Sequence, residues 1–477
     1  MRMAFRSASL VLFVCMLVAC ARNPATGQRQ LALISESQEI QMGREAAQQA
    51  QRSIGLVQDD ALQEYVHRVG TSLAALSERP NLPWTFRVVD DPTPNAFALP
   101  GGFIFITRGL LTYMDSEAEL ASVLGHEIAH VTARHGVQQI SRAQLAQLGL
   151  GLGMILVPEI QQFQGLLGTG LQLLFLKHGR DAEREADKLG FGYALEGGFD
   201  VREMGDIFAT LQQIAETEGR SPLPAWASTH PDPGARIAAV EKRVAALEVP
   251  LDDKRLGRED FLNRIDGLIF GNNPRQGFFE NNVFLHPDLA FRIEFPEGWR
   301  TQNLPQAVLA GAPEQDAVMQ LTLAPGTPEE AMQRFISQEG VRTSTPSRER
   351  INSLPALLTQ FAAQTQQGTI QGVVALIRHG DATYEIVGFT PAGRYAGRER
   401  AFLQTIGSFA PVDDPRVLNV RPRRIDVVEL PKPMSLSEFA RGDDGEVDLD
   451  TFALINQVDD VNARLPAGHL LKRIVSE

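Results

Sequence analysis

Residues 120–130 read Leu-Ala-Ser-Val-Leu-Gly-His-Glu-Ile-Ala-His, and this stretch carries the most specific pattern in the chain. Apolar residues recur in it at helical spacing, which predicts a helix over 116–134. His126 and His130 are four residues apart and would project from one face of that helix, where two imidazoles can grip one metal ion. Glu127 lies beside them, placed to accept a proton from a water that the metal activates. A helix with two hydrogen-bonded structural histidines is the plainer alternative.

A later segment, Glu183-Arg184-Glu185-Ala186-Asp187, supplies carboxylates at helical spacing. A catalytic zinc site needs three protein ligands and one open position, and a carboxylate from a second helix completes such a set. Both cysteines of the chain lie within its first twenty residues, so any metal must be held by histidine and carboxylate. Glu183 and Asp187 are four residues apart on the predicted helix, so if one of them is the third ligand, the other is near enough to accept the remaining N–H of a ligating histidine. Taken alone, the segment reads as a solvated helix face.

A third histidine, His230, stands in Ser228-Thr229-His230-Pro231-Asp232-Pro233-Gly234-Ala235-Arg236. The prolines predict a turn that places His230 on a loop just before a helix over 235–247. From the residues alone, a surface histidine in a turn is the favoured interpretation.

Together the three segments resemble the HtpX-like zinc metallopeptidase family (peptidase family M48), in particular its soluble periplasmic members. That family shows His-Glu-x-x-His, then Glu-x-x-Ala-Asp, then Ser-x-His-Pro-x-x-x-x-Arg, in the order found here. Residues 95–102 and 23–27 match the family as well, so the resemblance covers about residues 20–250. It implies a mainly helical zincin domain of the gluzincin type with a small, edge-stranded sheet.

The resemblance also implies the metal site. One zinc ion per chain would be held by His126, His130 and Glu183, with Glu127 as general base and acid of a zinc metalloendopeptidase. Asp187 would orient His126.

Further roles follow from the same resemblance. Arg236 would support the site. His230 would approach the open position on the metal, as an oxyanion donor or as a temporary fourth ligand that latches the site, and both roles stay open. His135 matches a recurrent family position, but helical spacing from His130 turns it away, so we expect it to be structural. The edge strand implied to pair with an extended substrate is Phe103-Ile104-Phe105-Ile106.

The N-terminus has the features of a lipoprotein signal. Arg2 and Arg6 precede an apolar run that is too short to span a bilayer and is typical of a secretory signal over residues 1–19. Leu17-Val18-Ala19-Cys20 resembles the lipobox of bacterial lipoproteins, in which the cysteine is acylated. The next residue is Ala21 rather than an aspartate, which resembles the lipoproteins that are sorted to the outer membrane. We therefore expect a periplasmic protein that is anchored to the inner leaflet of that membrane through lipidated Cys20. A plain signal peptide with an incidental cysteine is the alternative.

The body of the chain divides into blocks. Residues 20–35 read as a turn-rich tether and 36–255 as the peptidase domain. Within that domain, two leucine-rich stretches, 145–157 and 166–176, favour a buried hairpin or a lid rather than membrane spans.

The sequence pattern changes in the C-terminal half of the chain. Residues 280–412 mix strand and helix patterns and read as a separate α+β domain, and 295–299 resemble the opening of PsbP/Mog-like sandwiches. Residues 420–477 resemble a small, degenerate LysM-like unit, which would make peptidoglycan a partner. A packing domain with no ligand is equally compatible with them.

The whole chain is predicted to be an α+β protein. Its 477 residues are 43% hydrophobic, which excludes wholesale disorder, and its net charge of −13 argues against nucleic acid as a partner. The resemblance implies a lipid-anchored zinc endopeptidase that hydrolyses misfolded or stalled envelope proteins and works beside the outer-membrane assembly machinery. The alternative is a periplasmic chaperone or cell-wall-binding scaffold whose protease site is mostly latent.

Overall fold

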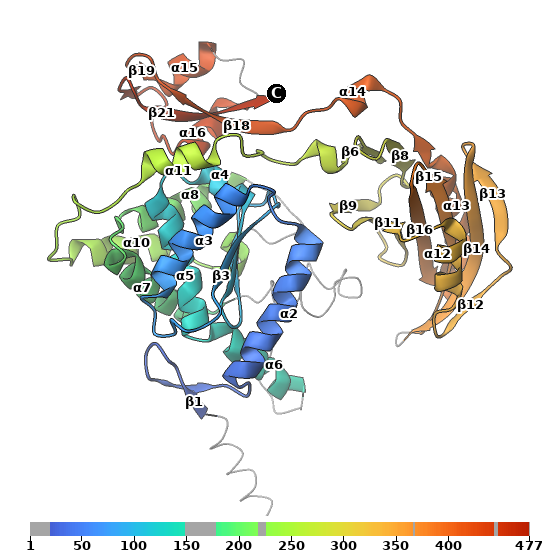
Figure 1. Cartoon of the computed structure of the whole chain (residues 1–477), viewed down its shortest axis with the longest axis horizontal. Helices are drawn as coiled ribbons and strands as arrows, with labels where there is room; N and C mark the ends of the chain where they lie inside the picture. The colour runs from blue at the N-terminus through green and yellow to red at the C-terminus, as the bar shows by residue number, and fades with distance from the viewer. Residues whose placement is uncertain (1–19, 148–177, 218–225, 366–367, 443–446, 477) are drawn as a thin grey trace, which may run out of the picture. The chain divides into compact units, whose positions relative to one another are not determined.

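The computed structural model describes residues 20–147, 178–217, 226–365, 368–442 and 447–476. They form two compact units, one joining residues 20–271 to 423–476 and the other spanning 272–422 (Figure 1). Helices and strands are mixed, as the predicted α+β class requires. The expected signal segment lies outside the described residues, and so do the two leucine-rich stretches apart from residues 145–147.

A three-stranded sheet lies next to the motif helix in the first unit. Its order is β3-β5-β4, with β3 (Thr85–Val89) parallel and β4 (Ala96–Leu99) antiparallel to β5 (Phe103–Thr107). The prediction of an edge strand at Phe103, Ile104, Phe105 and Ile106 is therefore wrong, because β5 is central and its backbone is paired on both sides. All five of its side chains are buried, the pattern of a strand that is covered on both faces.

Helices cover both faces of this sheet. On one face, α2 (Glu36–Ile54) packs its alanines against Phe97, Phe103 and Phe105. On the other face, Ile104 and Ile106 join the core formed by α3 (Asp60–Ala74) and α5 (Glu117–Thr132).

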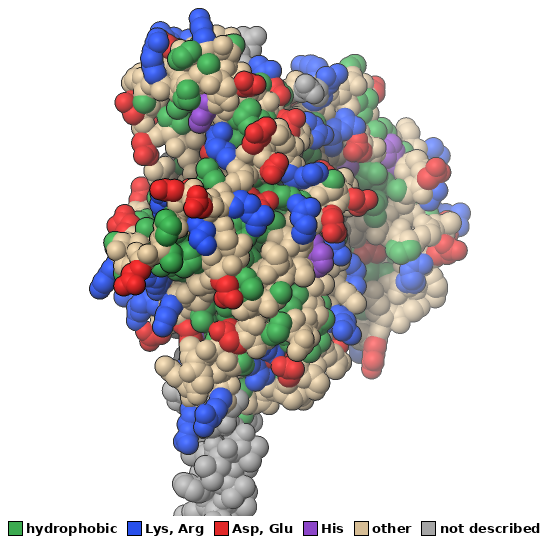
Figure 2. Space-filling view, turned by 60° about the vertical axis from the view of Figure 1, so that its left-hand side comes forward, with side chains coloured by type: hydrophobic (Ala, Val, Ile, Leu, Met, Phe, Trp, Pro, Cys, Tyr) green, Lys and Arg blue, Asp and Glu red, His purple; other side chains and the backbone are tan. Residues whose placement is uncertain are grey.

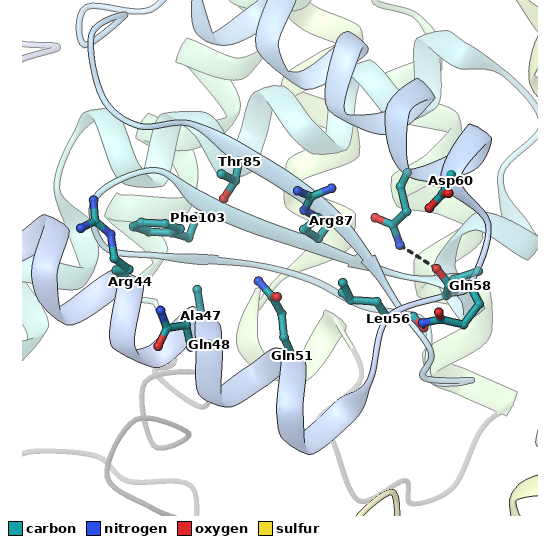
Figure 3. Close-up of a pocket in the computed structure, with 12 residues that line it drawn as sticks. Arg44, Ala47, Gln48, Gln51, Leu56, Gln58, Asp60, Thr85, Arg87 and Phe103 are labelled. Atoms are coloured by element: carbon teal, nitrogen blue, oxygen red, sulfur yellow. Dashed lines mark hydrogen bonds between the residues drawn. The ribbon is translucent and has the colours of Figure 1, made fainter.

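A pocket of about 430 Å³ remains between α2 and β3 (Figure 3). Polar side chains dominate its wall, with Phe103 and Leu56 as its large apolar members. None of the residues predicted to hold metal lines this pocket, so the predicted chemistry lies elsewhere.

The motif helix α5 is buried along its whole length. Ser116 caps it and exchanges hydrogen bonds with Glu119, which fixes where the helix begins. α7 (Arg180–Glu196) packs against α5 so closely that a Cβ atom on Gly190 would lie 2.7 Å from the backbone nitrogen of His126. Only glycine fits that approach, which brings the carboxylates of α7 to the motif. The motif helix matches its predicted range to within two residues.

The rest of the first unit surrounds these two helices. It contains a hairpin of β1 (Cys20–Arg22) and β2 (Arg29–Leu31) at its start. The other helices are α4 (Arg108–Tyr113), α6 (His135–Gln147), α8 (Glu203–Thr217), α9 (Trp226–Thr229), α10 (Pro233–Ala245) and α11 (Arg258–Ile265).

Residues 423–476 belong to the same compact unit as the peptidase-like helices. Buried Lys472 donates hydrogen bonds to the carbonyl oxygens of Thr112 and Met114, and Gln457 donates to Glu119 at the start of α5. The segment contains β18 (Arg423–Glu429), β19 (Met434–Ser435), α15 (Leu436–Gly442), α16 (Leu449–Ile455), β20 (Arg464–Leu465) and β21 (Leu470–Ser476). Its LysM-like character stays a prediction.

The second unit is built on a large antiparallel sheet with the order β12-β14-β15-β16-β11-β10-β9, where β13 also pairs with β14. A smaller sheet has the order β17-β8-β7-β6. The strands are β6 (Phe278–Glu280), β7 (Val283–His286), β8 (Phe291–Glu294), β9 (Arg300–Leu304), β10 (Ala307–Gly311), β11 (Val318–Ala324), β12 (Val341–Thr343), β13 (Ser347–Ile351), β14 (Leu354–Thr365), β15 (Gly368–His379), β16 (Ala382–Pro391) and β17 (Ala410–Pro411).

Helices α12 (Pro328–Ile336) and α13 (Tyr395–Ser408) pack on different core clusters of the second unit. Phe335 of α12 joins Phe361 in one cluster, and Phe402 of α13 joins Tyr384 in the other. A short helix, α14 (Pro415–Leu418), follows. The PsbP/Mog-like resemblance of this region stays a prediction.

Two surface features bear on partners. Among the described residues, no helix is both long enough and apolar enough to cross a bilayer. On the face shown in Figure 2, acidic and basic side chains are interspersed rather than gathered by sign. Charge therefore marks no docking surface on that face.

Candidate metal centre

Four buried side chains meet at one point: His126 and His130 from α5, Glu183 from α7, and His230, which follows α9. One donor atom of each lies within 4.8 Å of the other three. The Nε2 atoms of His126 and His130 are 3.0 Å apart, and oxygens of Glu183 lie 3.5 Å and 3.4 Å from them. His230 Nδ1 is 3.2 Å from His126 Nε2 and 3.1 Å from Glu183 Oε2.

This donor set fits a divalent metal ion. Bonds of about 2.0–2.1 Å to a tetrahedral zinc would put ligand atoms about 3.3 Å apart, close to the spacings found here. His126 Nδ1 lies 2.9 Å from the Asp187 carboxylate and donates its proton there, so Nε2 turns a lone pair toward the cluster. Lone pairs and carboxylate oxygens at these distances repel one another unless a cation lies between them.

The protonation behaviour of the cluster also favours a positive charge. Burial and Arg236 oppose a charge on His126, but hydrogen bonds to Asp187 and Glu183 outweigh them and raise the pKa of His126 to about 9. Burial likewise opposes ionisation of Glu183, yet His230 and His126 hold the pKa of that carboxyl well below its usual range. Burial and His178 lower the pKa of His130 in contrast, so the carboxylates rather than the imidazoles attract positive charge to the cluster. A metal ion at His126 Nε2 would supply that charge in place of a proton.

Arg236 and Asp187 form a buried pair behind His126. The Arg236 guanidinium donates two hydrogen bonds to Asp187, of 2.8 Å and 2.6 Å. It lies 4.1 Å from the ring centre of Phe208 and 4.3 Å from that of Trp226. Although burial opposes it, Arg236 lowers the pKa of Asp187 and keeps it an acceptor for His126. The structure thus brings both residues to the places that the sequence predicts.

Glu127 is buried beside the cluster but is engaged differently from Glu183. Its Oε1 lies 3.6 Å from His230 Nε2 and has no hydrogen-bond partner among the described residues. Burial raises the pKa of the Glu127 carboxyl, against the lowering effect of His230 and His126. A buried carboxylate oxygen that faces the cluster without a donor has the placement expected of a proton acceptor for a bound water.

His135 corrects one expectation. Arg134 adopts the left-handed conformation, with φ at 60°, so the chain turns after α5 and α6 begins at His135. The ring of His135 therefore meets His130, with 2.9 Å between the two Nδ1 atoms, and its Nε2 lies 2.8 Å from Glu185. The expectation that His135 points away from His130 is wrong, because it assumed that one unbroken helix runs through both residues.

Two further residues at the site were not anticipated. His178 stacks on His130 with ring centres 3.9 Å apart, and Trp226 stacks on His230 with ring centres 4.7 Å apart. Neither belongs to a motif with recognisable spacing, so no local signal in the sequence identifies them. Both rings restrict how the cluster histidines can turn.

Comparison with known proteins bears on this cluster. Residues 60–244, which run from α3 to α10 and contain all four side chains, match the family model described as Peptidase family M48. This region is a family M48 peptidase domain. The match covers residues 60–244 of the first unit and includes neither the second unit nor residues 423–476.

Relatives of the M48 domain come from bacteria and mitochondria. The chain is 33% identical over 235 residues to the beta-barrel assembly-enhancing protease of Yersinia pestis, covering 47% of this chain and 48% of that protein. It is 35% identical over 188 residues to the mitochondrial metalloendopeptidase OMA1 of Schizosaccharomyces pombe, covering 39% of this chain and 54% of that protein. The chain thus spans about half the length of the curated relatives it matches.

Solved structures show weaker likeness. Cyanobacterial PsbP from Synechocystis sp. PCC 6803 is 10% identical with a TM-score of 0.23, over 28% of this chain and 94% of that one. The Ran-binding protein Mog1p of Saccharomyces cerevisiae is 12% identical with a TM-score of 0.22, over 28% and 97%. Scores this low support no conclusion about the fold.

Proposed function

We propose that this protein is a zinc-dependent endopeptidase of the bacterial envelope. The observation that carries the proposal is the convergence of His126, His130 and Glu183, with their donor atoms at the edge lengths of a zinc tetrahedron. When bound there, zinc would polarise the scissile carbonyl and make a water nucleophilic at neutral pH. The M48 family match supports the same assignment.

Glu127 would move the proton. Its Oε1 would accept the proton of the attacking water and later deliver it to the leaving amine. Burial raises the pKa of this carboxyl, and a raised pKa suits a group that must both accept and release a proton near neutral pH. Asp187 would hold His126 in the tautomer that points Nε2 at the metal, with Arg236 fixing Asp187 in turn.

His230 would act as a latch. Its Nδ1 lies at the fourth corner of the cluster, within 3.2 Å of His126 and 3.1 Å of Glu183, where the attacking water must bind. Trp226 stacks against the ring and holds it there. Opening the site would require the 226–230 segment to move. The rival role, donation to the oxyanion, needs the ring beside the substrate carbonyl instead.

The substrate would bind as an extended strand along β4. This strand is an edge of the three-stranded sheet, packs against α5, and is paired only with β5 among the described strands. Backbone hydrogen bonds along an edge recognise any extended chain, so side-chain specificity would be loose. This placement replaces the one first expected for β5.

The setting would be the periplasm, with the chain anchored to the outer membrane through lipidated Cys20. Relatives named beta-barrel assembly-enhancing proteases support substrates among misfolded or stalled envelope proteins. The anchor is tested with Cys20→Ser, which should move the protein from the outer-membrane fraction to the soluble or uncleaved precursor pool. Unchanged fractionation and detergent partition would remove the lipoprotein assignment.

The catalytic proposal is tested with Glu127→Gln. The variant should retain zinc and lose casein hydrolysis by about 10²- to 10⁴-fold, because only the proton acceptor is removed. Glu45→Gln, an exposed change on α2, serves as the matched control and should cleave like wild type. Undiminished cleavage by Glu127→Gln would contradict the mechanism. Inactive protein that still complements a deletion strain would favour the non-proteolytic scaffold.

A further inference from the structure

The turn that follows the hairpin strand β1 is fixed by one buried side chain, Asn23. Asn23 Oδ1 accepts hydrogen bonds from the backbone N–H groups of Ala25 and Thr26, and the backbone N–H of Gly27 bonds back to Asn23. Gly27 has a φ of 70°, which favours glycine. The side-chain oxygen of Asn23 therefore stabilises the turn.

The other side of the same amide reaches α7. Asn23 Nδ2 donates to the carboxylate of Glu185, at 3.2 Å from Oε1. The other carboxylate oxygen of Glu185 lies 2.8 Å from His135 Nε2, and His135 Nδ1 lies 2.9 Å from His130 Nδ1. A continuous hydrogen-bonded path thus runs from the N-terminal turn to a histidine of the metal centre.

With both imidazoles neutral, as metal binding by His130 requires, only one arrangement of protons satisfies this path. An ionised carboxylate accepts hydrogen bonds and donates none, so His135 must donate from Nε2 to Glu185. His135 Nδ1 is then an acceptor, and His130 must donate from Nδ1 to it. The Nε2 atom of His130 is left with a lone pair, which faces His126 Nε2 and Glu183. Asn23 adds a donor to Glu185 and holds that carboxylate in place.

We propose that the turn over residues 23–27 is a positioning element of the metal centre, acting on His130 through Glu185 and His135. This inference rests on the proposed metal site. The partners of a ligating histidine set its tautomer and ring orientation, and losing one such partner lowers metal affinity about 10- to 100-fold. Asn23 and Glu185 are positioning residues, since neither contacts the cluster itself.

The path from Asn23 through Glu185 and His135 to His130, called the relay below, begins next to the proposed membrane anchor. β1 leads from Cys20, the proposed lipidation site, straight into Asn23. β2 then packs its buried Gln30 on α6, the helix that begins with His135. The segment beside the anchor is therefore part of the support of the metal site rather than a spacer.

The test compares two changes in the same hairpin. Asn23→Ala removes one donor to Glu185 together with the acceptor that builds the turn, whereas Gln30→Ala removes a buried contact to Gln138 that is not part of the path. Zinc dissociation constants are measured by chelator competition on the full chain in detergent. Asn23→Ala should weaken zinc by more than about twofold but by less than the roughly 10- to 100-fold that follows the loss of a ligand's direct partner, and Gln30→Ala should stay within about twofold of wild type. Equal weakening by both changes would mean general packing and overturn the relay.

A reciprocal exchange provides a rescue and keeps the test independent of folding. Asn23→Asp sets two carboxylates against each other, and Glu185→Gln sets two amide donors against each other, so each alone should weaken zinc. Together they restore a donor–acceptor pair and should recover affinity and the visible spectrum of the cobalt-substituted protein. Failure of the double variant to recover would overturn the relay. Wild-type protein that binds no zinc would instead refute the proposed metal site on which the relay depends.

Discussion

The two histidines of α5 are held by different kinds of support. His126 is backed by the Asp187–Arg236 ion pair, which is buried and covered by Phe208 and Trp226. His130 is backed by His135, Glu185 and Asn23, a path of hydrogen bonds that ends at the N-terminal turn. Side-chain exposure is 1% for Asp187 but 25% for Glu185.

This difference in exposure predicts how much each support contributes to the stability of the fold. A charge pair inside the domain must remain intact because an unpaired charge there is costly. A partly exposed carboxylate can be rearranged by solvent and by neighbours at little cost. We therefore expect the His126 side to govern folding as well as metal binding, and the His130 side to govern metal binding alone.

The largest expected effect tests that contrast directly. Asp187→Asn removes the carboxylate that pairs with Arg236 and leaves Glu183, 3.4 Å from the guanidinium, as its remaining acidic neighbour, so it should reduce the free energy of unfolding by up to about 3–5 kcal/mol. Glu185→Gln, the matched change on the same helix, should cost less than about 1 kcal/mol. Urea denaturation of the two apo variants measures both, and equal losses would remove the distinction between the supports.

A second prediction concerns His230, which stacks on the same Trp226 that covers Arg236 and so belongs to the His126 side. If His230 latches the site, His230→Ala should raise basal proteolysis and self-cleavage while zinc is retained. A fall in kcat of about 10²- to 10³-fold with zinc retained would identify an oxyanion donor instead. Unchanged activity would exclude both roles.

Part of this account could be predicted from the sequence because it depends on local spacing. His126, Glu127 and His130 share one helix, and Glu183 and Asp187 share another, so residue spacing alone places each pair. The position of His135 could not be predicted, because it depends on the left-handed turn at Arg134.

Other features escaped prediction because distant segments decide them. The central place of β5 follows from pairing with strands on both sides, while its own residues suit a strand in any position. The packing of residues 423–476 depends on Lys472, whose carbonyl partners lie more than 300 residues away in sequence. Such contacts leave no periodic pattern.

A smaller effect than that of Asp187→Asn is predicted for Glu203 of α8, which contacts the Ser116 cap at the start of α5. The Ser116 hydroxyl donates a hydrogen bond to Glu203, and burial raises the pKa of the Glu203 carboxyl to about 7. A carboxyl with a raised folded-state pKa binds more protons folded than unfolded, so stability falls as pH rises from about 4.5 to about 7. The fall should be about 2–3 kcal/mol, and Glu203→Gln should flatten it in urea titrations at pH 5 and pH 8. An unchanged pH slope in that variant would contradict the assignment.

The central claim is that His126 and His130 of α5, together with Glu183 of α7, hold one zinc ion. Zinc content after dialysis, measured by atomic emission, tests it most directly on wild type, His126→Ala and His130→Ala. The account predicts about one zinc per chain in wild type and almost none in either variant, because two remaining protein ligands bind zinc poorly. Near-stoichiometric zinc in either alanine variant, or none in wild type, would contradict it.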